Sequence, residues 1–222
     1  MESSRQVQYA LLCKPCEDVL NEGGENWVVP LFARYDGVFN FYDLLTNLTP
    51  DATFEGFDGY ATAQNPDIKA DKLIHFALGV FWKAAVHSWE GGKRQPLIEL
   101  GRYREQVGTF LRGDTGFPEH MALVIGVTRP PVKEIAFLAP FRTIERAYHR
   151  FYFYTSGILW TLSVGKAVDE EFRKVSFATN PCRPILVGNF STDVKQVFGT
   201  VLQFAKKARN LEKYLHPPKA KC

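Results

Sequence analysis

The stretch from Asp71 to Trp89 constrains the fold of this chain more than any other part of its sequence. Apolar residues recur there with the period of an α-helix, and further apolar residues fill most of the remaining circumference. The first set is Leu73, Ala77, Val80, Phe81 and Ala84, and the second is Ile74, Phe76, Leu78, Trp82 and Val86. A helix that is apolar on nearly all sides is a buried helix. We therefore predict a central helix that the rest of the chain covers, with the first set facing a sheet.

After Met121 the hydrophobic period changes in a way that predicts β-strands. Five segments rich in β-branched and aromatic residues are separated by Pro, Gly or Asn. They read MALVIGVT, EIAFLAPF, HRFYFYTSGILWTLSVG, VSFAT and PILVGNF. We expect them to form four to six strands of a mostly antiparallel sheet. Because helices precede the strands and do not alternate with them, the pattern indicates an α+β fold.

The segments on either side of these strands are predicted to be helical or to lie in loops. A second helix is expected from Gln95 to Asp114, with Gly113 ending it, and a long C-terminal helix is expected to begin near Ser191. Residues 40–66 are expected to hold a short helix and then a loop. We divide the chain into an N-terminal segment, residues 1–40, with a short strand, a zinc-knuckle-like turn and a short helix, and an α+β domain, residues 41–222. The two are expected to form one compact unit.

The composition excludes several classes of protein. Hydrophobic residues make up 45% of the 222 residues and aromatic residues 14%, which is enough for a core and argues against disorder. A net charge of +3 is too small to indicate nucleic-acid binding by itself. No apolar run reaches the roughly 20 residues that a membrane-spanning helix requires, and no signal-peptide pattern is present. We therefore expect a cytoplasmic protein without membrane contact.

The motif that points most directly to chemistry is a Cys-x-x-Cys pair, Cys13 and Cys16. One interpretation is a redox site, because a proline between two cysteines is typical of thioredoxin-like proteins, although no parallel-sheet pattern surrounds this pair. The other interpretation is one half of a zinc site, which commonly needs four ligands. Cys182 and Cys222 are isolated, and the five histidines form no ligand-spaced pair. The sequence thus predicts an incomplete zinc site, which a protein partner or a second copy in a homodimer would complete.

Three short elements follow one another in the first half of the chain. They are Cys13, Cys16 and Glu17, then Gly24, Glu25, Asn26 and Trp27, and then Phe81, Trp82 and Lys83. In this order they resemble a group of uncharacterised bacterial proteins related to HNH (His-Me finger) endonucleases, over roughly residues 5–112. In that group a leucine-rich strand leads into Cys-x-x-Cys-Glu, a Gly-Glu-aromatic stretch follows, and a later helix has a Phe-Trp-Arg-like centre.

The resemblance also implies elements that are not found ahead of Cys13. HNH relatives carry an earlier Cys-x-x-Cys and a His-x-x-Pro-like stretch, whose histidine activates water beside a divalent metal. We therefore expect an uncharacterised bacterial protein of HNH-related ancestry that is non-catalytic in this form and acts through protein or nucleic-acid contacts. A first alternative is a metal-dependent HNH-type nuclease whose N-terminal half is missing. A second is a small-ligand or nucleotide-binding module that uses the aromatic sheet.

Three further patterns each have a structural and a functional interpretation. The C-terminal region is basic, so Lys206, Lys207, Arg209 and Lys213 are candidates for weak nucleic-acid binding, or simply a solvated helix face. The aromatic stretch HRFYFYTSGILW is compatible with an RNA-stacking sheet but favours a strand packed in a core. His75, on a mostly apolar helix, is expected to be a hydrogen-bonded core residue and not a metal ligand.

Overall fold

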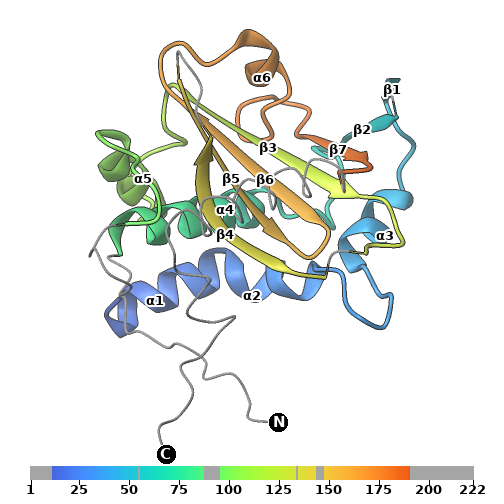
Figure 1. Cartoon of the computed structure of the whole chain (residues 1–222), viewed down its shortest axis with the longest axis horizontal. Helices are drawn as coiled ribbons and strands as arrows, with labels where there is room; N and C mark the ends of the chain where they lie inside the picture. Colours follow the sequence, from blue (N-terminus) through green and yellow to red (C-terminus); the bar gives the residue numbers. More distant parts are fainter. Residues whose placement is uncertain (1–11, 55, 88–95, 134, 144–147, 191–222) are drawn as a thin grey trace, which may run out of the picture.

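The computed structural model describes residues 12–54, 56–87, 96–133, 135–143 and 148–190 (Figure 1). The chain has an α+β fold, with a largely helical first half followed by most of the sheet. The helical elements are α1 (Lys14–Leu20), the π-helical η1 (Asn21–Glu25), α2 (Asn26–Val28), the 3-10 helix η2 (Val29–Leu31), α3 (Asn40–Thr46), α4 (Ala70–Val86), α5 (Tyr103–Leu111) and α6 (Glu170–Lys174). The first four follow one another without a break and form one N-terminal helical run.

The described part of the chain forms a seven-stranded sheet with the order β1-β2-β7-β3-β6-β5-β4. The strands are β1 (Ala52–Phe54), β2 (Phe57–Ala61), β3 (Met121–Thr128), β4 (Phe137–Thr143), β5 (His149–Thr155), β6 (Ile158–Val164) and β7 (Pro184–Gly188). Neighbouring strands are antiparallel except β3 and β7, which are parallel. The predicted α+β class with a mostly antiparallel sheet is therefore confirmed. Five of its strands, β3 to β7, come from the region after Met121, where four to six were expected.

Helix α4 is the central buried element that its sequence predicts. Leu73, Ala77 and Phe81 are completely buried, whereas Val80 of the same predicted face is only partly buried. The ring of Phe81 lies 4.9 Å from that of Phe153 on β5, measured between ring centroids. Helix α4 therefore packs against one face of the sheet, and in Figure 1 it crosses behind strands β4 to β6.

The aromatic strands β5 and β6 form the other side of this core. Phe151, Phe153 and Trp160 are each at most 1% exposed in this core, and the equally buried Tyr154 packs in a separate cluster with Leu159 and Phe190. The rings of Phe153 and Trp160 are stacked, with centroids 5.4 Å apart. This burial confirms that these rings of the aromatic stretch pack in a core, whereas Tyr152 is only partly buried.

The N-terminal helical run packs into the same hydrophobic core as the sheet. Leu20, Val28 and Leu31 are buried members of that core. In Figure 1 the run lies alongside α4 and below it, while the strands lie in front of and above that helix. Residues 12–31 are therefore joined to the rest of the fold through α4.

Three sequence predictions are wrong in detail. The helix expected from Gln95 is confined to Tyr103–Leu111, because Gly101 adopts a left-handed φ of +54° just ahead of it; Gly113, with φ of +80°, follows its end as expected. The segment VSFAT forms turns after α6 and no strand. Its apolar character reflects the complete burial of Phe177. The loop expected within residues 40–66 contains the hairpin β1-β2, which turns at Gly56 with φ of +88°.

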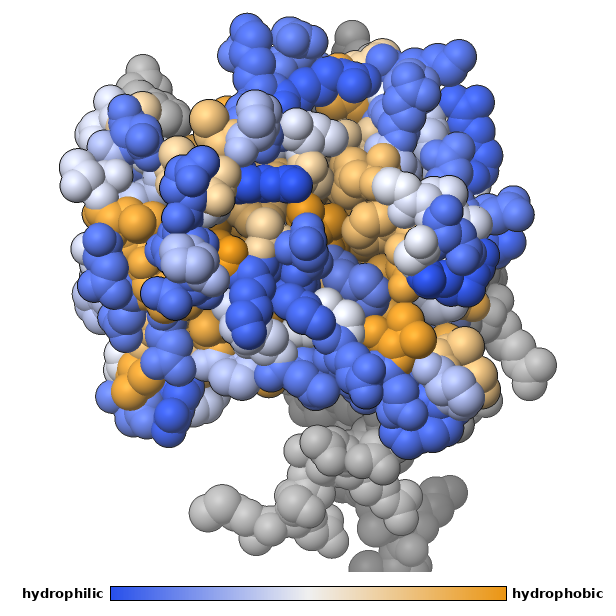
Figure 2. Space-filling view, turned by 180° about the vertical axis from the view of Figure 1, so that it is seen from behind, coloured by the Kyte–Doolittle hydropathy of each residue, from blue (hydrophilic) through white to orange (hydrophobic). Residues whose placement is uncertain are grey.

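On the face opposite to that seen in Figure 1, hydrophilic and hydrophobic side chains are mixed (Figure 2). Hydrophilic residues cover most of that face, with smaller hydrophobic areas between them. None of the helices in the described ranges has the length and apolarity needed to cross a membrane. The strand predicted before Cys13 and the long C-terminal helix lie outside the described residues.

Candidate functional site

The two cysteines of the Cys-x-x-Cys motif lie at the start of the N-terminal helical run. Cys13 is the N-cap of α1, and its carbonyl accepts a hydrogen bond of 3.0 Å from the Glu17 N–H. Pro15 is the second residue of the helix, where its missing N–H loses no helical hydrogen bond. The first helical turn thus places Cys16 beside Cys13, and both residues are exposed.

The two thiols interact with each other. A side-chain hydrogen bond with Cys16 lowers the pKa of the Cys13 thiol from its ordinary value. The same hydrogen bond, together with the charge on Cys13, raises the pKa of Cys16, and the nearby Arg112 guanidinium opposes that rise. Cys13 is therefore the first of the pair to become a thiolate, with the Cys16 thiol donating to it.

An apolar groove of about 210 Å³ lies directly beside Cys16. It is built from the start of the helical run, from α4 and from the C-terminal end of α5. Its lining includes Leu12, Pro15, Val19, Trp82, Leu111 and Arg112. Sequence reasoning did not assign Leu111 or Arg112 to this site, because only the packing of α5 against α4 brings them near the cysteines.

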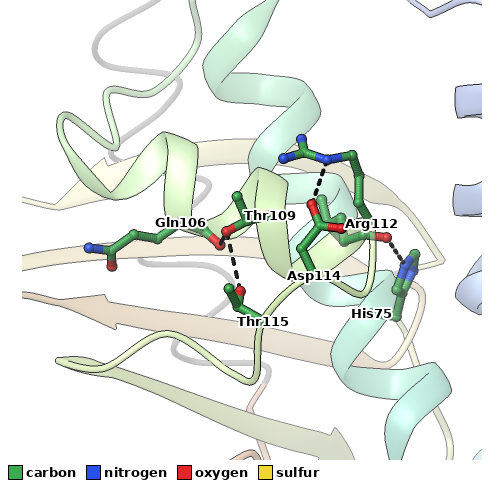
Figure 3. A network of polar contacts seen from close by, with 7 residues as sticks. His75, Gln106, Thr109, Arg112, Asp114 and Thr115 are labelled. Carbon is green, nitrogen blue, oxygen red and sulfur yellow. Dashed lines mark hydrogen bonds and ion pairs between the residues drawn. The ribbon is translucent and has the colours of Figure 1, made fainter.

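Figure 3 shows how Arg112 is positioned just after α5. Its Nε donates to the Asp114 carboxylate at 2.9 Å, and the hydroxyls of Thr115 and Thr109 are hydrogen-bonded at 3.2 Å. These contacts are local to the turn that follows the helix. They tie the position of Arg112 to the end of α5.

His75, on α4, connects this helix to α5. Its Nε2 lies 3.1 Å from the carbonyl oxygen of Leu111, as Figure 3 shows. Burial lowers the pKa of the imidazole, which favours its neutral form. The predicted hydrogen bond is confirmed, but the side chain is only partly buried and is not part of the core.

The Gly-Glu stretch holds the helical run against α4. A Cβ atom at Gly24 would lie 2.6 Å from the carbonyl oxygen of Lys72 and 2.7 Å from the backbone nitrogen of Phe76. Next to it, the Glu25 carboxylate forms an ion pair with the Lys83 ammonium, and both side chains are about one quarter exposed. Two of the three elements that carry the HNH resemblance are therefore in direct contact in the fold.

The other predicted site residues are not brought to the cysteine pair. Cys182 is exposed just before β7, and its carbonyl accepts a hydrogen bond of 3.0 Å from the Thr62 N–H. Strand β7 lies on the side of the molecule away from α1 (Figure 1). Within the described ranges, no three His, Cys, Asp or Glu residues form a group that could hold a metal. The remaining candidates lie outside the described residues: Lys206, Lys207, Arg209, Lys213 and Cys222.

Comparison of the chain with family models, with curated proteins and with solved structures found no match. The function must therefore be inferred from the chain's own residues. Among those that the structure describes, the exposed thiol pair with its adjoining groove combines a reactive group and a surface that can receive a partner.

Proposed function

We propose that this chain is a non-catalytic protein of HNH-related ancestry that acts through protein contacts, with Cys13 and Cys16 as half of a zinc site that a second copy of the chain completes. The supporting observation is that two exposed thiols lie within hydrogen-bonding distance of each other at the start of α1. Structural zinc sites are tetrahedral and often use four thiolates. Two copies related by a two-fold axis each donate one pair, which supplies all four ligands.

The surface around the thiols supports a contact with protein. The groove beside Cys16 exposes mainly apolar side chains, including Leu12, Val19 and Trp82. A partner that covers the thiols also removes this apolar surface from water, which favours association. Zinc bound there holds the two copies in one geometry, because its four ligands have defined directions.

The proposal predicts about half an equivalent of zinc per chain, together with a dimer. The reduced chain is loaded with zinc, freed of excess metal, and measured by elemental analysis and by sedimentation. Removal of the zinc with a chelator is expected to return the chain to a monomer, because the metal supplies most of the binding free energy.

Two cysteine variants form a matched pair for this experiment. Cys13→Ser should lose both the zinc and the dimer. Cys182→Ser removes an exposed thiol away from the pair and should keep both. The proposal is wrong if one zinc is held tightly by each monomer, if the dimer forms without metal, or if the chain retains no zinc.

A further inference from the structure

A second site lies at the end of the sheet where β4 ends, β5 begins and β6 ends. It is a cleft of about 460 Å³, closed on one side by the segment that leads into α5. Cationic and aromatic side chains from four places in the chain line it: Arg102, Tyr103, Arg142, Tyr148, His149 and Lys166. Its volume is within the range of small-molecule sites, roughly 300–1,000 Å³.

The charge of this cleft is predominantly positive. Among the residues that the structure describes, Arg102, Arg142 and Lys166 contribute three cations to the lining, and Glu99 is its one carboxylate. None of these cations forms an ion pair with another residue that the structure describes. Three cations that converge on a cleft with one carboxylate leave a net positive charge, which favours an anionic ligand.

The two tyrosines of the cleft are held in place by arginines. Arg102 donates to the Tyr103 hydroxyl at 2.9 Å, and its guanidinium lies 4.9 Å from the centre of that ring. Arg150 donates to the Tyr148 hydroxyl and lies 4.0 Å from the centre of the Phe172 ring. Ordered aromatic walls lower the entropic cost of binding a ring. The cleft thus combines an anion-attracting rim with preformed aromatic surface.

We propose that this cleft binds a small phosphorylated molecule that carries a ring, of the nucleoside monophosphate kind. Arg142 and Lys166 hold the phosphate, since guanidinium and ammonium groups form strong charge-assisted hydrogen bonds to phosphate oxygens. Tyr148, whose side chain is partly exposed, contacts the ring. This inference is independent of the zinc half-site, because no residue lines both the cleft and the groove beside Cys16.

The test is isothermal titration of the full chain with adenosine monophosphate, with adenosine and with inorganic phosphate. The nucleotide is expected to bind more tightly than either component. An R142Q/K166Q double variant should weaken nucleotide binding by about tenfold or more, because charge-assisted hydrogen bonds are lost. Both side chains are exposed, so the variant is expected to fold.

An R104Q/K174Q double variant is the matched control. It removes the same two charges from exposed positions that do not line the cleft, and it should bind the nucleotide as the unmodified chain does. Equal weakening in both variants would show unspecific charge attraction. Equal affinity for phosphate and the nucleotide would show an anion site without ring contact. Either result, or no binding of the nucleotide, overturns the proposal.

The pKa of the His149 imidazole gives a second readout of binding, and it can be measured without substituting Arg142 or Lys166. Burial and the Arg142 charge lower its pKa, and Lys166, Arg102 and Glu99 are the other charged groups that line the cleft. A bound phosphate opposes the effect of Arg142 and raises this pKa. Proton NMR of the unmodified chain, with the signal assigned by an H149Q variant, should show that rise with the nucleotide. An unchanged His149 signal at saturating nucleotide contradicts the proposal.

Discussion

Phe81 is the residue on which the packing of α4 against the sheet most directly depends. It is completely buried, and its ring meets that of Phe153 edge-on at 4.9 Å. Replacing Phe81 with Ala is expected to cost on the order of 3–5 kcal/mol of unfolding free energy, because lost burial and the cavity left behind add together. Urea denaturation of the purified variant measures this loss.

A smaller apolar truncation on the same helix is the control. Val86 is 38% exposed at the end of α4, so Val86→Ala is expected to change the unfolding free energy by only about 0.5 kcal/mol or less. A loss below about 1 kcal/mol for Phe81→Ala would show that the side chain does not fill the core as the structure indicates.

At the scale of elements, Gly24 shows why η1 can lie against α4. Helix propensity alone favours Ala over Gly by about 1 kcal/mol. At this position, however, the added methyl group meets backbone atoms of α4 at 2.6 and 2.7 Å. We expect the clash to prevail, because backbone cannot move aside as a side-chain end can. Gly24→Ala should therefore lower the unfolding free energy by about 1–3 kcal/mol.

Gly116→Ala is the matched substitution for this prediction. An added Cβ there meets no heavy atom within 4 Å, and its φ is outside the strained range. Chemical denaturation of the two variants under the same conditions should separate them clearly. If Gly24→Ala were as stable as Gly116→Ala, the helical run would not approach α4 as closely as described.

For the whole molecule, we expect no cleavage of single- or double-stranded DNA with magnesium, manganese or zinc. HNH-type hydrolysis requires a base that activates water and a cation at the scissile phosphate, and none of the five histidines lies in a His-x-x-Pro setting. Weak, salt-sensitive binding through Lys206, Lys207, Arg209 and Lys213 stays a prediction from the sequence. A plasmid-nicking assay measures cleavage, and a filter-binding assay at two salt concentrations measures affinity.

The nicking assay needs a control for contaminating nuclease. A His120→Ala, His149→Ala double variant serves this purpose, because both histidines lie at the end of the sheet where Met121 and His149 each pair with Val164. Activity that persists in this variant belongs to a contaminant. Activity that disappears with the two imidazoles would show a catalytic site of this chain's own and refute the prediction.

The sequence alone predicts those elements whose buried residues recur with a clear local period. The helical period around Phe81 predicts α4, and the run from Met121 to Thr128 predicts β3 with the same bounds. Where one backbone conformation overrides an apolar pattern, the sequence misleads. Gly101 interrupts a continuous helical signal, and Phe177 supplies an apolar signal in a segment that forms turns.

By itself, the sequence also determined that Cys13 and Cys16 lie near each other, because four consecutive residues at a helix start span one turn. Only the tertiary structure decided what surrounds them. The groove beside Cys16 needs Trp82 from α4 and Leu111 from α5, and the second cleft combines Arg102 with Arg142 and Lys166. Such groups are brought together by the packing of helices and the order of strands. That packing depends on contacts between residues distant in sequence, and no local periodicity encodes those contacts.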